Sequence, residues 1–128
     1  MKRLFVVTAV TEAGAGAGLM CFPSTLVALI LGSPLDTAAA VAVGRLAGAA
    51  VFALAVANWL ARRDQSGPAA TGLVAAMVLY HVGTVVILGA AGVWSPPTGA
   101  LLWPVVVVHA AMTVWCIASL SGASPASK

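Results

Sequence analysis

Charged side chains are scarce in this sequence. Only 7% of its 128 residues are Asp, Glu, Lys or Arg, and 62% are hydrophobic, whereas a soluble domain usually carries about 25% charged residues. A soluble fold of this composition would expose apolar patches well beyond the roughly few hundred Å² that monomers tolerate. The shortage of charge therefore excludes an ordinary soluble domain and places most of the chain in lipid.

Basic runs and cysteine motifs are also lacking. The net charge of +3 arises from Lys and Arg residues that stand at the ends of apolar segments or inside one and form no stripe, so the sequence predicts no nucleic-acid partner. Cys21 and Cys116 fall within apolar segments and have no CxxC or His-linked spacing. We interpret them as small hydrophobic residues, not as a disulfide or a metal-binding pair.

Sequence signatures of hydrolytic and phosphoryl-transfer chemistry are missing as well. The sequence contains no nucleophile elbow, no HExxH segment, no phosphate-binding loop and no paired carboxylates. These absences set aside the corresponding enzyme classes. They favour a role other than catalysis, without deciding the question.

Long apolar segments are what the sequence does contain. A membrane-spanning helix needs about 20 predominantly apolar residues, and turn-forming residues divide the chain into such segments at about residues 4–31, 37–61, 69–92 and 99–120. We predict an all-α fold, an integral membrane four-helix bundle with up-down-up-down topology, formed by one domain over residues 1–128. Pro23 lacks a backbone donor and predicts a kink or break near Phe22 in the first segment.

The distribution of charge predicts how these helices are oriented. One side of the predicted zigzag holds the basic residues Lys2, Arg3, Arg62, Arg63 and Lys128. The loops of the other side hold only Asp36. By the positive-inside rule we expect both termini to be cytoplasmic, in a multi-pass protein of the plasma (inner) membrane.

Glycine spacing predicts where two helices pack closely. Gly14 and Gly18 form a GxxxG pattern in the first segment, and Gly44 and Gly48 form another in the second. Small residues let helix backbones approach one another in lipid. Because the two patterns fall at overlapping depths, we predict tight packing between the first two membrane-spanning helices.

Each apolar segment carries one ionisable residue well inside its ends: Glu12, Arg45, His81 and His109. A charge near the bilayer centre costs at least about 2.5–3.5 kcal/mol, so such residues usually face the bundle interior. Ser95 is equally far in sequence from His81 and His109, so an antiparallel hairpin places both imidazoles at one depth. Glu12 lies about 12 Å from the cytoplasmic boundary and Arg45 about 12 Å from the outer one. The four residues are therefore predicted to form a polar ladder across the bundle.

Three functions for this ladder stay open beside a purely structural role, in which Asn58 and nearby hydroxyls satisfy the charges. The favoured one is an accessory or ligand-binding protein, whose ladder lines a pocket or docks onto a larger membrane complex or a second copy. The second is a haem b carrier or electron-transfer subunit with His81 and His109 as axial ligands. The third is a proton-coupled small transporter with Glu12 as its coupling residue.

Two stretches resemble a known group. Gly18-Leu-Met-Cys-Phe-Pro23-Ser24 and Gly44-Arg45-Leu-Ala-Gly48 resemble small four-helix bacterial membrane proteins of the DoxX-like and related uncharacterised groups. The resemblance covers roughly the first half of the chain and implies a four-helix bundle that serves as a membrane partner of redox or oxidative-stress systems. The sequence also has a partial likeness to small multidrug resistance transporters, which have a glutamate early in the first helix, where Glu12 stands. Arg45 and the one-sided charge depart from that second pattern.

Overall fold

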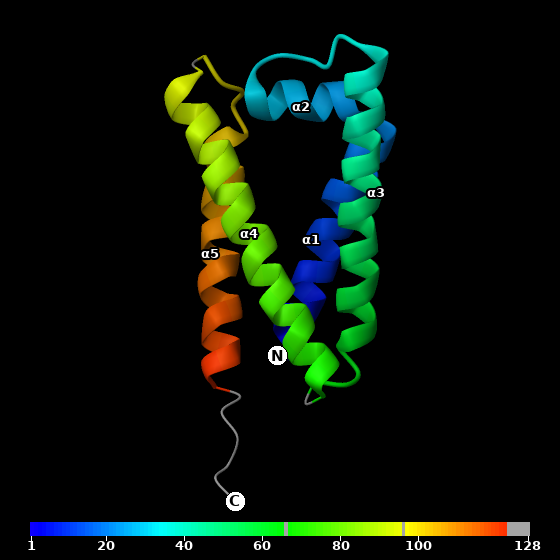
Figure 1. The fold of residues 1–128 in the computed structure, drawn as a ribbon, viewed down its shortest axis with the longest axis vertical. Helices are drawn as coiled ribbons and strands as arrows, with labels where there is room; N and C mark the ends of the chain where they lie inside the picture. Colours follow the sequence, from blue (N-terminus) through cyan, green and yellow to red (C-terminus); the bar gives the residue numbers. More distant parts are fainter. Residues whose placement is uncertain (66, 96, 123–128) are drawn as a thin grey trace, which may run out of the picture.

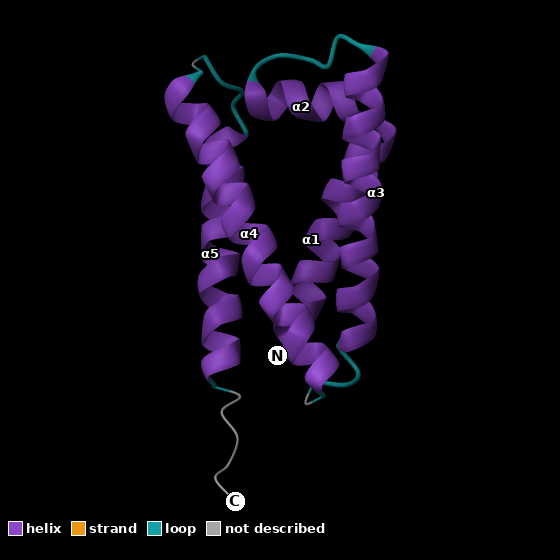
Figure 2. Cartoon of the chain, in the orientation of Figure 1, coloured by secondary structure: helices purple, strands orange, loops and turns teal. Residues whose placement is uncertain are grey.

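The chain is all-helical over the residues that the computed structural model describes, namely 1–65, 67–95 and 97–122. Lys128, predicted among the cytoplasmic charges, lies outside these ranges. Every helix except the second is long and apolar enough to cross a membrane, as expected of a multi-pass membrane protein. In chain order the helices are α1 (Lys2–Cys21), α2 (Pro23–Leu31), α3 (Ala38–Ala61), α4 (Pro68–Trp94) and α5 (Leu102–Ser121) (Figures 1 and 2).

The first predicted span, residues 4–31, is two helices and not one. Phe22 has non-helical angles, φ −133° and ψ 53°, so α1 ends before it and Pro23 opens α2. Proline suits that first position because its missing N–H needs no helical partner there. The predicted break near Phe22 is present, but a continuous kinked span to residue 31 is wrong: α2 has nine residues and lies across one end of the molecule (Figure 1).

The four long helices form two antiparallel pairs. α1 packs mainly against α3, and α4 packs mainly against α5. The N-terminus, the turn between α3 and α4, and the end of α5 lie together at one end, called here the terminal end (Figure 1). α2 and the turn between α4 and α5 lie at the opposite end, called the α2 end.

Gly16 and Gly48 form the close contact between α1 and α3. A Cβ atom on Gly16 would lie 2.6 Å from the backbone nitrogen of Phe52, and one on Gly48 would lie 2.8 Å from the carbonyl oxygen of Gly16. Gly14 was predicted at this crossing, but a Cβ there would meet nothing within 4 Å. Residues two apart in a helix point about 200° away from each other, so Gly16 faces α3 while Gly14 faces elsewhere.

The other two predicted packing glycines lie near α2. A Cβ on Gly18 would approach the Leu26 side chain, and one on Gly44 would approach Leu35 and Pro23. Neither glycine therefore serves the crossing of α1 and α3. Of the two GxxxG patterns, only Gly48 lies at that contact.

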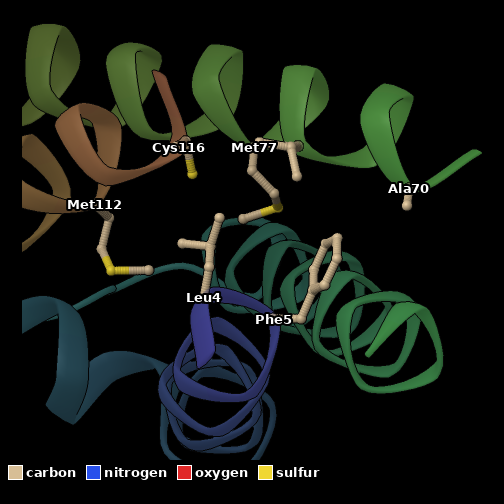
Figure 3. Close-up of a cluster of buried hydrophobic side chains, with 7 residues drawn as sticks. Leu4, Phe5, Ala70, Met77, Met112 and Cys116 are labelled. Carbon is tan, nitrogen blue, oxygen red and sulfur yellow. The ribbon is translucent and has the colours of Figure 1, made fainter. Parts of the chain in front are cut away.

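An apolar cluster joins the two helix pairs at the terminal end (Figure 3). We call it the apolar plug; its buried members are Leu4, Phe5, Ala70, Val74, Met77, Met112 and Cys116. Asn58 of α3 lies beside it and donates from Nδ2 to the Leu54 carbonyl at 2.9 Å and to Met77 Sδ at 3.4 Å. Asn58 thus links α3 to α4. The structural interpretation had expected it to bond the ionisable residues, but its partners are Leu54 and Met77.

Backbone hydrogen bonds join the two pairs at the α2 end. The N–H groups of Gly99 and Leu101 donate to the carbonyls of Ile30 and Leu29 at 3.1 and 2.9 Å. Carbonyls in the last turn of a helix lack partners within the helix, so the segment before α5 satisfies them. This bonded stretch also explains why α5 begins at Leu102 and not at the predicted residue 99.

Candidate functional site

A cavity of about 530 Å³ lies between the two joined ends, and we call it the chamber. α2 contributes Leu26 and Ile30 to its lining, and most of its other lining residues on α1, α4 and α5 are also apolar. Its few polar side chains are Tyr80, Thr84 and His109. The chamber is thus an apolar space with polar groups on the α4 and α5 side.

The chamber reaches the surface sideways, between helices. Gly14 of α1 lines it and is exposed, and Ile87 of α4 lines it and is 69% exposed. Both positions lie in the membrane-spanning segments, not in a connecting turn. The chamber therefore opens sideways, between apolar helices and away from the connecting turns.

A second, smaller cavity of about 70 Å³ adjoins the chamber on the side of the terminal end. We call it the polar cavity; Ala15, Tyr80 and His109 line both spaces. Its complete lining is Thr11, Glu12, Ala15, Tyr80, His81, Val108, His109 and Met112. The polar cavity thus gathers ionisable side chains from three helices.

Three rings cluster at the polar cavity. The ring centroids of His81 and His109 lie 5.2 Å apart, with planes inclined at 71°, and the Tyr80 ring lies 5.2 Å from His81 and 5.8 Å from His109. His109 Nδ1 is 2.9 Å from the Val105 carbonyl of its own helix. A neutral imidazole that donates from Nδ1 keeps Nε2 as an acceptor, so His109 offers an acceptor to the site.

Glu12 and His81 are buried without a partner. They are only 4% and 3% exposed. Neither carboxylate oxygen of Glu12 and neither ring nitrogen of His81 has a hydrogen-bond partner in the part of the chain that the structure describes. Buried polar groups are nearly always hydrogen-bonded, and leaving one unsatisfied costs about 1–3 kcal/mol, or more for a charge. Two such groups on one cavity wall make the polar cavity the candidate functional site.

The structure brings together three of the four predicted site residues, Glu12, His81 and His109. Arg45 is not among them: it is exposed on α3, and no α3 residue lines the chamber or the polar cavity. The reason is that α3 packs against α1, on the side of α1 away from these spaces. The prediction that Arg45 joins the other three residues in a polar ladder is therefore wrong.

Tyr80 belongs to the site, and the sequence reasoning missed it. A tyrosine in an apolar span does not draw attention as a carboxylate or an imidazole does. Tyr80 directly precedes His81, however. Neighbouring residues in a helix point about 100° apart, so both can face the space between two other helices. Thr84 lies one turn further along α4, so the spacing of Tyr80 and Thr84 could have indicated a polar face on this helix.

The two imidazoles do not fit the haem b hypothesis. Axial ligands must stand on opposite faces of a porphyrin, with its plane between them. Here the rings of His81 and His109 touch edge to face, and Tyr80 fills the space beside both. Nor, across the described ranges, does any group of three or more His, Cys, Asp or Glu side chains have the geometry to hold a metal ion.

Comparison with known proteins does not place the chain in a family: no family model, curated protein or solved structure matches it. The resemblance to DoxX-like groups and the partial likeness to small multidrug resistance transporters therefore stay predictions. The chamber and the polar cavity are the features of the molecule that bear on its function.

Proposed function

We propose that this protein is a multi-pass membrane protein that binds a small lipophilic ligand. The body of the ligand occupies the chamber, and its polar head occupies the polar cavity beside Glu12, His81 and His109. One observation carries the proposal: Glu12 and His81, which are buried and have no hydrogen-bond partner among the described residues, line a polar cavity that adjoins an apolar one. A ligand with a polar head and an apolar body matches both spaces.

The route of access supports a ligand that dissolves in lipid. α2 lies across one end of the chamber and the apolar plug fills the terminal end. The exposed lining residues Gly14 and Ile87 lie between these ends. A compound that reaches the site from the side must first partition into the bilayer.

Binding is better supported than proton-coupled transport. A transporter needs a path from its coupling residue to each side of the membrane. Between Glu12 and the terminal end stand the packed side chains of Leu4, Met77 and Met112. We therefore favour an accessory or ligand-binding protein, for which one lateral opening is enough.

The orientation of the protein is part of the proposal. Lys2, Arg3, Arg62 and Arg63 lie at the terminal end, while Asp36 follows α2 at the other. The positive-inside rule then makes the terminal end cytoplasmic in a bacterial inner membrane. In this orientation α2 lies near the outer surface.

Photolabelling in lipid nanodiscs tests the binding function. The probes are two alkyl diazirines with the same chain, one ending in an amine and the other in a hydroxyl group. At least one probe should label the chamber residues Leu26, Leu88 and Val105 saturably, as read by mass spectrometry. Leu79, which is 76% exposed, should be labelled in proportion to the probe dissolved in lipid.

A matched pair of tryptophan variants controls this experiment. Leu26→Trp places a bulky ring inside the chamber and should weaken or remove saturable labelling, whereas Leu79→Trp adds the same ring to the exposed surface and should leave it unchanged. Labelling that is confined to lipid-facing residues with both probes contradicts the proposed function. So does saturable labelling of the chamber that persists in Leu26→Trp.

A further inference from the structure

We propose that the head of the ligand is a protonated primary or secondary amine, held by the Glu12 carboxylate and by Nε2 of His109. This inference rests on the proposed ligand site and names the chemical class that the site accepts. It assigns to Glu12 the role of counter-charge, with the rings of Tyr80 and His81 beside the ammonium group.

The hydrogen-bonding groups of the polar cavity are mostly acceptors. Both carboxylate oxygens of Glu12 are unpartnered among the described residues, and His109 offers Nε2 because its Nδ1 faces the Val105 carbonyl. A neutral His81 adds one acceptor and one donor. An alkylammonium group carries only donors, so it matches this set, whereas a phosphate or carboxylate head would bring acceptors against acceptors.

The charge of the site points to the same class. No Lys or Arg side chain lines the chamber or the polar cavity: in the parts of the chain that the structure describes, basic residues stand at the terminal end or, as Arg45, on the exposed face of α3. A carboxylate buried without a cation carries a desolvation cost that nothing offsets. A cationic ligand supplies the missing charge, and its N–H groups form charge-assisted hydrogen bonds.

The shape of the site narrows the class further. A tyrosine ring attracts cations over its face, and the Tyr80 ring lines the polar cavity with its centroid 5.2 Å from that of His81 and 5.8 Å from that of His109. At about 70 Å³, the polar cavity suits a compact head with free N–H groups. Alkyl amines, like the lysine side chain, are protonated at neutral pH, while the neutral form crosses the lipid.

The paired diazirine probes test the amine assignment. In the wild-type protein the amine probe should saturate the labelling of Val105 at a concentration about tenfold lower than the hydroxyl probe, because only the amine forms a charged hydrogen bond with Glu12. Glu12→Gln keeps the shape and removes the charge, so the two probes should then saturate at similar concentrations. Asp36→Asn, the same chemical change outside both cavities, should keep the wild-type preference.

The outcomes separate this inference from the proposed function. Equal saturation by the two probes in the wild-type protein overturns the amine assignment and leaves the lipophilic site standing. Saturation by neither probe overturns both. A preference for the amine that survives in a folded Glu12→Gln variant shows that Glu12 is not the counter-charge and also overturns the assignment. The wild-type comparison needs no variant, so it decides even where Glu12→Gln fails to fold.

Discussion

At the scale of single residues, Glu12 and Asn58 are a natural comparison. Both are buried polar side chains, but Asn58 donates to Leu54 and Met77, whereas Glu12 has no hydrogen-bond partner within the described ranges. Burial of a satisfied polar group is nearly neutral, and burial of an unsatisfied one costs about 1–3 kcal/mol. Glu12 is therefore expected to lower the free energy of unfolding of the protein.

Glu12→Met should stabilise the ligand-free protein by about 1–3 kcal/mol, because it removes the unsatisfied carboxylate and keeps a similar length. Thermal unfolding in detergent, followed by circular dichroism, measures the shift. Asn58→Leu is the control, since it breaks existing hydrogen bonds and should lower the unfolding temperature. A lower unfolding temperature for Glu12→Met would show that the carboxylate is stabilised in a way the structure does not contain.

His81 and His109 should act as one unit. Their rings touch at a centroid distance of 5.2 Å, so removing either ring opens the polar cavity and displaces the other. We expect His81→Ala, His109→Ala and the double variant to weaken saturable photolabelling by the amine probe to a similar extent, as residues in contact are not additive. Losses that add up in the double variant would indicate two independent roles.

Three of the four site residues predicted from the sequence, Glu12, His81 and His109, do lie together, and the reason is physical. Lipid provides no hydrogen-bond partner, so Glu12, His81 and His109 had to face inward, and equal spacing from Ser95 set the two histidines at one depth. The same rule failed for Arg45 because it assumed that every helix faces one shared interior. Apart from Arg45 and Asn58, α3 is almost entirely apolar, so its sequence could not reveal that it packs mainly against α1.

At the scale of helices, Gly16 should matter more than Gly14. A Cβ on Gly16 would press on the backbone of Phe52 and Gly48, and one on Gly14 would meet nothing within 4 Å. Gly16→Ala should therefore destabilise the protein by about 1–3 kcal/mol through overpacking, while Gly14→Ala should be neutral or slightly stabilising. Unfolding by a denaturing detergent measures both, and equal effects would place the crossing of α1 and α3 elsewhere.

The attachment of α2 can be tested at Gly99. A Cβ there would collide with the carbonyl of Leu29, so Gly99→Ala should separate α2 from the segment before α5. We expect Gly99→Ala to speed amide hydrogen exchange at Leu101 and to lower the unfolding temperature. Gly89→Ala is the control, because nothing lies within 4 Å of a Cβ there. Unchanged exchange at Leu101 would mean that α2 is held by other contacts.

Hydropathy and turn residues predicted three of the membrane-spanning helices to within a few residues, because length and apolar content set a span. Hydropathy and turn residues could not predict that residues 23–31 form a separate helix. A proline is compatible with either a kink or a full break, and the choice depends on hydrogen bonds from Gly99 and Leu101, far along the chain. The sequence also could not predict that Gly16 lies at the contact with α3, because which glycine faces a neighbour depends on where the two helices cross.

At the scale of the whole molecule, the charge distribution predicts which end faces the cytoplasm. In a variant with Cys21 and Cys116 replaced by alanine, a cysteine at Ser33 should react with a membrane-impermeant maleimide in intact cells. A cysteine at Asp64 should react only after the membrane is opened, since Lys2, Arg3, Arg62 and Arg63 hold that end inside. Labelling of Asp64→Cys in intact cells would reverse the orientation or show a mixture of both.

Joining of the two helix pairs at both ends has a consequence for how the site fills. Because α2 and the apolar plug hold the ends together, only the middle of the molecule is free to widen. A ligand of the proposed site would then exchange with the membrane interior and not with water, so we expect site occupancy to follow the mole fraction of ligand in the bilayer. Below saturation, added lipid dilutes the ligand and empties the site even when its total amount is constant, and a more hydrophobic body raises occupancy without any new contact with the protein.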